Sequence, residues 1–118
     1  MPFVETILFK EDLKKFKQIS DSITSNLCKI FKTKKNLITI YNTAVDKKNF
    51  YHNSILGSKE KRIFIKIYGL KRNKYLKRKL ASLILDNIQK LVNVKKPENI
   101  AIYFFDKEID DIYHGKIK

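Results

Sequence analysis

The segment RIFIKIYG, from Arg62 to Gly69, carries the clearest structural pattern in the sequence. Three isoleucines alternate in it with other side chains, and a period of two is typical of a β-strand with one buried face. The isoleucines form that face, and Arg62, Phe64, Lys66 and Tyr68 form the other. Gly69 is expected to end the strand. The stretch therefore predicts a strand that borders a core on one side only.

A helix and a further strand follow this stretch. Asn73 can cap the helix, because its short side chain accepts a backbone N–H of the first turn. The apolar stripe of the helix recurs at steps of three and four and consists of Leu76, Leu80, Leu83, Ile84, Ile88 and Leu91. The turn Pro97-Glu98 then leads into a second strand, IAIYFF, at residues 100–105. This half of the chain therefore reads strand, helix, strand.

The first half of the chain repeats this order. Residues 3–9 are rich in apolar, β-forming side chains and predict a strand. Residues 11–32 carry apolar side chains at steps of three and four, which predicts an amphipathic helix with Glu11 and Asp12 near its positive end. Residues 37–41 predict a second strand. Each half is therefore one βαβ unit.

The polar, turn-rich stretch 42–61 separates the two units and is expected to be a long loop with a short strand at residues 50–51. The units, at about 1–45 and 60–106, make up a single domain of residues 1–118. Because βαβ crossovers are right-handed, both helices are expected on one face of a four-stranded mixed sheet. The expected fold class is α+β.

The other face of this sheet has no helix left to cover it. Part of an apolar set points that way, namely Phe3, Ile7, Phe64, Tyr68, Tyr103 and Phe105. A bare apolar surface on a small protein is typical of contact with another chain. We therefore expect a homo-oligomer.

Composition excludes several classes of protein. No stretch approaches the roughly 20 apolar residues of a membrane span, and the N-terminus lacks the basic and apolar run of a secretory leader. The one cysteine, Cys28, allows no disulfide framework or cysteine-based metal site within one chain. His52 and His114 are too few for a metal site, and no glycine-rich phosphate loop occurs. We expect a cytoplasmic protein without a membrane partner, a metal or a cofactor.

The chain is strongly basic, with 26 lysines and arginines against 12 acidic residues and a formal net charge of +14. Such an excess favours a nucleic acid or another anionic surface as partner. Only three of these residues are arginines, however, and the abundance of lysine, isoleucine and asparagine is typical of translation from an A+T-rich genome. The densest run, Lys71–Lys79, is therefore either a polyanion-binding patch or the solvated first turns of a helix.

The N-terminus Met1-Pro2-Phe3-Val4 resembles the opening of tautomerase-superfamily proteins. In the second half, IKIYGLKRN at 65–73, Lys77 and the turn at 97–99 are similar to the strand, Gly-Arg-Ser-like turn, helix lysine and Pro-Glu-Asp turn of the branch that contains malonate semialdehyde decarboxylase. The tail DDIYHG at 110–115 is similar to that branch's Asp-Trp-Ser-Phe-Gly ending. The resemblance spans nearly the whole chain. It implies the fold shared with macrophage migration inhibitory factor, with paired βαβ units assembled as trimers around their bare sheet faces.

The resemblance also implies that Pro2 is a catalytic base. Methionine before proline is normally removed, and an apolar, cationic setting then favours the neutral form of the secondary amine. A neutral amine can take a proton alpha to a carbonyl and return it elsewhere, which is the keto–enol tautomerisation of a small 2-oxo acid. Arg72 and Lys10 would bind the carboxylate of this substrate. Tyr103 would donate a hydrogen bond to its carbonyl oxygen.

Departures from the branch bear on the reaction. Lys35 and Asn36 occupy the stretch where relatives that decarboxylate or hydrate carry an acid. Ile112 stands for the tail tryptophan, and Leu70 stands for a second arginine. Decarboxylation is therefore not expected, and tautomerase activity is expected to be weak or lost.

Other interpretations stand beside the enzymatic one. Pro2 can simply begin a strand. Lys10 and Arg72 can be solvated charges, and Tyr103 can pack in the core. A ferredoxin-like fold has the same element order and predicts a non-enzymatic RNA-binding protein that uses Lys71–Lys79 and the sheet aromatics, although its strand lacks the glycines of an RNA-recognition module. A third interpretation is a tautomerase-fold scaffold without chemistry.

Overall fold

The computed structural model describes residues 2–115 of the protein. Met1, whose removal the sequence predicts, and the basic end at 116–118 lie outside the described residues. No helix within the described range has the length and apolar character needed to cross a membrane.

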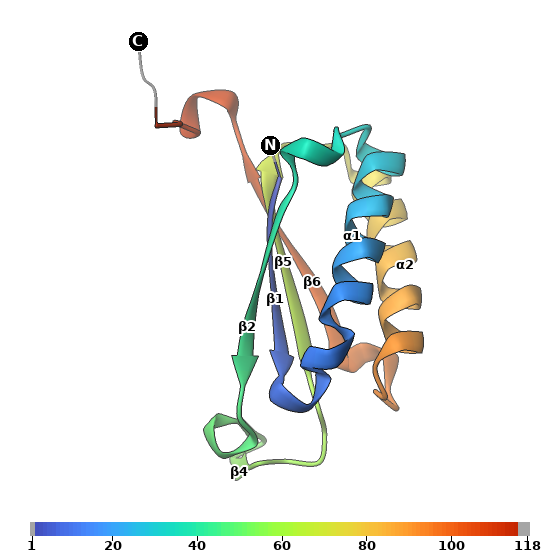
Figure 1. Cartoon of the computed structure of the whole chain (residues 1–118), viewed down its shortest axis with the longest axis vertical. Coiled ribbons are helices and arrows are strands. Elements are labelled where there is room, and N and C mark those ends of the chain that lie inside the picture. Colours follow the sequence, from blue (N-terminus) through green and yellow to red (C-terminus); the bar gives the residue numbers. More distant parts are fainter. Residues whose placement is uncertain (1, 116–118) are drawn as a thin grey trace.

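Four strands build the main sheet: β1 (Phe3–Phe9), β2 (Thr39–Val45), β5 (Ile63–Leu70) and β6 (Ile100–Lys107). Their order is β2-β1-β5-β6. The outer pairs β1–β2 and β5–β6 are parallel, and the central pair β1–β5 is antiparallel. Figure 1 shows α1 (Phe16–Phe31) and α2 (Lys74–Leu91) side by side on one face of the sheet. The predicted α+β fold, a four-stranded mixed sheet with both helices on one face, is confirmed.

Short elements connect these parts. The expected long loop contains a two-stranded hairpin of β3 (Tyr51–His52) and β4 (Ile55–Leu56). Short 3₁₀ helices are η1 (Lys10–Lys15), η2 (Lys35–Leu37), η3 (Lys47–Asn49), η4 (Pro97–Asn99) and η5 (Ile109–Asp111). In Figure 1 the hairpin lies at the lower end of the sheet, and the start of β1 lies at the upper end. Asn73 caps α2 as predicted, since its Oδ1 accepts the backbone N–H of Leu76 at 2.8 Å.

The core lies between the sheet and the two helices. Alternate side chains of β5, Ile63, Ile65 and Ile67, are buried there with Val4 and Leu8 of β1. The helices contribute Ile19, Ile23, Leu27, Leu80, Ile84 and Ile88. Burial of each such side chain stabilises the fold by about 1.5–3 kcal/mol. The one hydroxyl on this face of β1, that of Thr6, donates a hydrogen bond to Oδ1 of Asn42 at 2.9 Å.

The opposite face of the sheet is bare, and the side chains predicted for it lie there. The rings of Phe3 and Tyr68 are 5.3 Å apart between centroids, and Tyr68 stacks on Phe105 at 4.5 Å. Tyr41 of β2 joins this group, with its ring 5.6 Å from that of Phe3. Tyr103 is 54% exposed, so the interpretation that it packs in the core is wrong for a single protomer. Aromatic side chains therefore cover much of the side of the sheet away from the helices, and the ion pair of Lys66 with Glu5, at 3.7 Å, lies among them.

The predicted start of the first helix is wrong. Residues 10–15 form a 3₁₀ turn, and α1 begins only at Phe16. Within this turn Asp12 is buried and lies 3.0 Å, Oδ2 to Nζ, from Lys61. This contact joins segments far apart in the chain, and helical periodicity carries no signal for it.

Two predicted strand ends are also wrong. The second strand, expected at 37–41, runs from Thr39 to Val45 because it pairs with β1 along the whole length of that strand, polar residues included. Gly69 does not end β5, since it pairs with Asp106 and the next residue, Leu70, pairs with Lys107. In both cases a neighbouring strand, rather than the local sequence, sets the end.

Candidate active site

Pro2 is buried directly before β1, the second strand of the sheet. Its carbonyl oxygen accepts the backbone N–H of Thr39 at 3.3 Å, which continues the β1–β2 pairing by one residue. On the other side lies Gly69 of β5, where an added Cβ would be 3.6 Å from the Cα of Pro2. A proline fits this place because it has no N–H to pair and a fixed φ. The neighbouring strands therefore hold the ring at the upper end of the sheet.

Aromatic rings lie on the bare face at the same end of the sheet as Pro2. Phe3, Tyr68 and Phe105 follow one another across β1, β5 and β6. Such surroundings contain few polar groups to solvate a charge, so they favour the neutral form of an amine.

Arg72 lies at the same end, in the connection between β5 and α2, only three residues beyond Gly69. Its guanidinium carbon stands 5.2 Å from the ring centroid of Phe31, the last residue of α1. A cation over an aromatic face is attracted to it, which holds the side chain in place. Arg72 is half-buried and forms no ion pair with any carboxylate that the structure describes. The structure thus brings Pro2 and an uncompensated arginine to one end of the sheet.

Lys10 and Tyr103 do not join this pair within one protomer. Lys10 follows the last residue of β1, so the whole strand, about 25 Å at the usual rise, separates it from Pro2. Its Nζ lies 3.4 Å from Oδ2 of Asp46. Tyr103 lies opposite Lys66 near the middle of the bare face. Only a neighbouring protomer can carry either side chain to Pro2.

The stretch that holds an acid in the resembled branch also lies at the upper end. Lys35 and Asn36 form part of η2, just before β2, and both are exposed. The carboxylate of Asp106 is engaged by Lys77, with Nζ to Oδ2 at 2.7 Å. The arrangement is therefore cationic, and it suits binding of a carboxylate better than acid-assisted decarboxylation.

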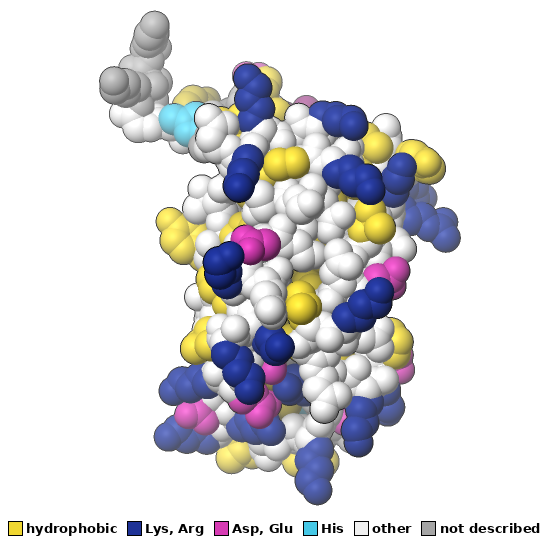
Figure 2. Space-filling view, turned by 45° about the vertical axis from the view of Figure 1, so that its right-hand side comes forward, with side chains coloured by type: hydrophobic (Ala, Val, Ile, Leu, Met, Phe, Trp, Pro, Cys, Tyr) yellow, Lys and Arg dark blue, Asp and Glu magenta, His cyan; other side chains and the backbone are white. Residues whose placement is uncertain are grey.

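The run Lys71–Lys79 spans the β5–α2 connection and the first turns of α2, as the solvated-helix interpretation requires. Figure 2 shows lysines and arginines spread over the whole visible face rather than gathered over one element. Lys77, in the middle of the run, is half-buried by its contact with Asp106 and lies 5.7 Å from the ring of Phe104. The run is therefore not an unbroken surface of free cations.

Carboxyl groups with a displaced pKa lie elsewhere, at the lower end of the sheet. A hydrogen bond from Lys61 lowers the pKa of Glu11, the backbone N–H of Lys48 lowers that of Asp46, and a hydrogen bond from Lys96 lowers that of Glu60. Among residues 2–115, no three His, Cys, Asp or Glu side chains gather to hold a metal ion. None of five clefts on the described surface is lined by Pro2.

Sequence reasoning missed two neighbours of the site. The contact of Gly69 with Pro2 follows from the β1–β5 register, which no local pattern contains. The place of Phe31 under Arg72 depends on the packing of α1 against the β5–α2 connection. The apolar stripe of the first helix includes Phe31, but it carries no sign of a partner.

The sequence matches no protein-family model, and no curated protein matches it. Solved structures do match over almost the whole chain. A wild-type fused 4-OT, described as an asymmetric trimer, is 12% identical, with a TM-score of 0.85 over 96% of this chain and 92% of its own. A protein called N1, of the cis-3-chloroacrylic acid dehalogenase family, is 12% identical, with a TM-score of 0.80 over 96% and 80%. Pt0534, inactivated by 2-oxo-3-pentynoate, is 6% identical, with a TM-score of 0.84 over 96% and 91%.

The fused 4-OT and the dehalogenase-family protein are structures of the tautomerase superfamily. This chain therefore has the tautomerase fold. The architecture that the resemblance implied, two βαβ units in one sheet, is confirmed.

Proposed function

We propose that the protein is a member of the tautomerase superfamily in which Pro2, freed by loss of Met1, moves a proton on a small 2-oxo acid. The observation that carries this proposal is the burial of Pro2 at the sheet end where Arg72 lies without a carboxylate partner. The fold supports it, since structures with the same fold include a fused 4-OT. Pt0534, with the same fold, reacts with 2-oxo-3-pentynoate, a compound of the proposed substrate class.

The proposed reaction needs one base and one anchor. Arg72 binds the substrate carboxylate through two parallel N–H donors, which fixes the adjacent 2-oxo group toward Pro2. The neutral proline nitrogen removes a proton from C3, and the electron pair of that C–H bond forms the enol double bond as the oxo oxygen gains a proton from water. The protonated proline then gives its proton to the hydroxide left by that water, which restores the neutral base. In the reverse direction the protonated proline delivers its proton to C3, and the enol O–H proton is lost to water. No cofactor is consumed in either direction.

We propose further that the working form is a homotrimer with its bare sheet faces inside. One protomer exposes large aromatic side chains across that face, and none of the five described clefts reaches Pro2. A neighbouring protomer would cover the aromatic rings and provide the missing wall of the site. Two fused 4-OT structures with this fold are described as trimers, one asymmetric and one symmetric.

Ketonisation of the enol of phenylpyruvate tests the enzymatic proposal. The Met-free protein is expected to accelerate it, and Pro2→Ala is expected to lower kcat by about 10²–10⁴-fold, the usual contribution of a general base. Arg72→Ala should lower kcat/KM by about 10- to 100-fold, since a charged hydrogen-bonded anchor is lost. Arg78→Ala, an exposed arginine of α2, is the matched control and should leave the rate unchanged. Equal rates for the wild type and Pro2→Ala would remove the proposal.

The bare aromatic face also favours a second candidate, binding of single-stranded RNA. Exposed rings such as Tyr41 and Tyr103 can stack on bases, and the net charge of +14 attracts phosphates. The two candidates make opposite demands on this face, because a trimer buries it. A gel shift with single-stranded RNA at about 0.15 M salt separates them. Tight, salt-sensitive binding by a monomer favours RNA.

A further inference from the structure

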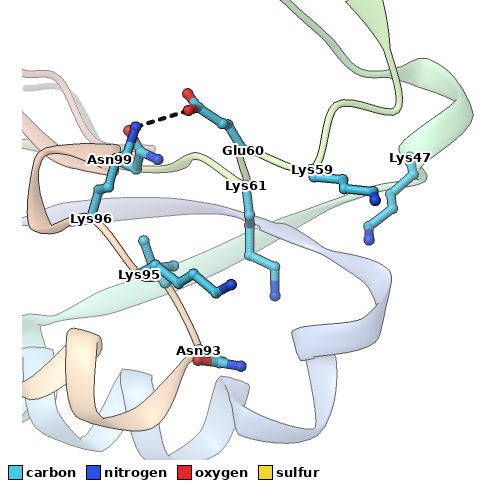
Figure 3. Close-up of a pocket in the computed structure, with 9 residues that line it drawn as sticks. Lys47, Lys59, Glu60, Lys61, Asn93, Lys95, Lys96 and Asn99 are labelled. Carbon is cyan, nitrogen blue, oxygen red and sulfur yellow. Dashed lines mark hydrogen bonds and ion pairs between the residues drawn. The ribbon is translucent and has the colours of Figure 1, made fainter.

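A second site lies at the lower end of the sheet, away from Pro2. Here the segment before β5 and the η4 connection between α2 and β6 enclose a cleft of about 280 Å³. Five lysines line it: Lys47, Lys59, Lys61, Lys95 and Lys96. Figure 3 shows Lys47 and Lys59 extending toward one another, with Lys61 and Lys95 extending into the same space from a second side. Ammonium groups from three separate segments of the chain therefore converge.

The carboxylate that lines the cleft is turned away from its centre. Glu60 receives a hydrogen bond from Lys96 at 3.0 Å on one oxygen, and His52 lies 3.4 Å from the other. This pairing with Lys96 is visible in Figure 3 as the dashed contact at the rim. The hydrogen bond lowers the pKa of Glu60 and raises the pKa of Lys96. Both groups are therefore charged at neutral pH and neutralise one another at the rim of the cleft.

The remaining lysines are only partly compensated. Lys61 is largely buried, at 16% side-chain exposure, and pairs with Glu11 at 3.2 Å and Asp12 at 3.0 Å. Lys47 shares Glu11 at 3.5 Å. Lys59 and Lys95 pair with no carboxylate among residues 2–115. Five lysines thus face three carboxylates, and two positive charges are left over.

A buried amide adds a neutral polar group to these charges. Asn99 lines the cleft and is 6% exposed, and its side-chain amide can donate a hydrogen bond to a ligand there. The lining of this cleft is thus suited to an acceptor-rich anion rather than to an apolar ligand.

We propose that this cleft binds the di- or triphosphate group of a small molecule. Lysines bind phosphate oxygens as point charges, and the two uncompensated charges match an anion of at least two charges. A cleft of about 280 Å³ lies below the range of about 300–1,000 Å³ typical of drug-sized ligands, so it suits the phosphate chain itself. The chain can come from inorganic polyphosphate or from the end of a nucleotide. This site is independent of the chemistry proposed for Pro2.

Calorimetric titration with inorganic triphosphate at about 0.15 M ionic strength tests the proposal. The wild type should bind one equivalent per chain. The double variant Lys59→Gln/Lys95→Gln, which touches no described ion pair, should weaken binding by at least about tenfold, and Glu60→Gln should strengthen it, because it removes a negative charge from the rim. The matched control is Lys29→Gln/Lys79→Gln, two exposed lysines of the helices that change the net charge equally. It should retain the wild-type affinity within about threefold.

Absence of binding, several equivalents per chain, or the same loss in both double variants would overturn the proposal, since binding would then be absent or would follow net charge alone. Weaker binding by Glu60→Gln would contradict the charge argument in the same way. A parallel titration with ATP identifies the source of the phosphate chain. Equal affinity for ATP and triphosphate supports recognition of the chain alone, and tighter binding of ATP supports a nucleotide.

Discussion

Pro2 packs against Gly69, where an added Cβ would lie 3.6 Å from the Cα of the proline and 3.7 Å from its Cβ. These are ordinary contact distances, so the glycine leaves room for one small side chain and no more. Pro2 lies directly before β1, and Gly69 lies one residue before the end of β5, the antiparallel neighbour of β1. The central strand pair therefore fixes where the proline ring sits, and Gly69 lies against that ring.

Substitutions at Gly69 should affect the proposed activity without unfolding the protein. Gly69→Ala is expected to change the free energy of unfolding by no more than about 0.5 kcal/mol and to keep activity, because the added methyl group makes normal contacts. Gly69→Leu is larger and must displace Pro2, so ketonisation of phenylpyruvate enol should fall while circular dichroism still reports the same fold. A folded Gly69→Leu protein with the wild-type rate would contradict the placement of Pro2 as the base.

The bare face should hold the protomers together. Phe105→Lys places a charge in the aromatic stack with Tyr68, and burial of an unpaired charge in an interface is strongly unfavourable. Light scattering after size exclusion should report about three times 14.0 kDa for the wild type and a single chain for the variant. Tyr75→Lys, at a 70% exposed position of α2, is the control and should remain trimeric. A monomeric wild type would remove the proposed assembly.

The helix–sheet core should dominate stability. Ile84 of α2 is fully buried in the core cluster, so Ile84→Ala is expected to lower the free energy of unfolding by about 2–5 kcal/mol through lost burial and a cavity. Tyr75→Ala on the exposed side of the same helix should change it by no more than about 0.5 kcal/mol. Urea unfolding followed by circular dichroism measures both. Similar losses in the two variants would place the core elsewhere.

Glu11 should make the free energy of unfolding decrease at acid pH. The hydrogen bond from Lys61 holds the pKa of its carboxyl below the usual 4.5 in the folded state. The folded state thus binds this proton less readily than the unfolded state, so the stabilisation is present above about pH 4.5 and is lost as the pH falls through the lowered value. The melting temperature of Glu11→Gln should be below that of the wild type at neutral pH, and the difference should shrink steadily as the pH falls below about 4.5.

The control for this measurement is Glu98→Gln, an exposed carboxylate that forms no ion pair with the described residues. It should lower the melting temperature little at either pH. A Glu11→Gln protein whose deficit persists unchanged in acid would show that the ion pair is not the cause.

Local sequence patterns were enough for the layers of the fold. Alternation in RIFIKIYG identifies the buried face of β5, and the apolar stripes identify both helices, because burial on one side imposes those periods. The patterns fail where a distant partner decides. β2 extends through Asn42 because that side chain bonds to Thr6, and residues 10–15 leave the helix around the Asp12–Lys61 pair.

The same distinction between local patterns and distant contacts applies to the candidate site. The antiparallel pairing of the first strand of each unit brings Pro2 and Arg72, the two residues that the resemblance named, to one end of the sheet. The same topology sends Lys10 to the other end, as a seven-residue strand requires. Sequence patterns could not predict the cleft lined by five lysines, because its side chains come from segments that are brought together only by the fold.

The role of Pro2 as a free N-terminal base is tested most directly by the intact mass of the protein. The mass is measured before and after treatment with 2-oxo-3-pentynoate, with peptide mapping of the product. We predict a mass without the initiator methionine and a gain of one reagent on the N-terminal peptide, since the N–H of a free Pro2 adds across the triple bond, forming an N–C bond and a new C–H bond. A variant that retains Met1 should gain none there. Natural protein that retains Met1, or a free Pro2 that stays unmodified, would contradict the role of this nitrogen as the base.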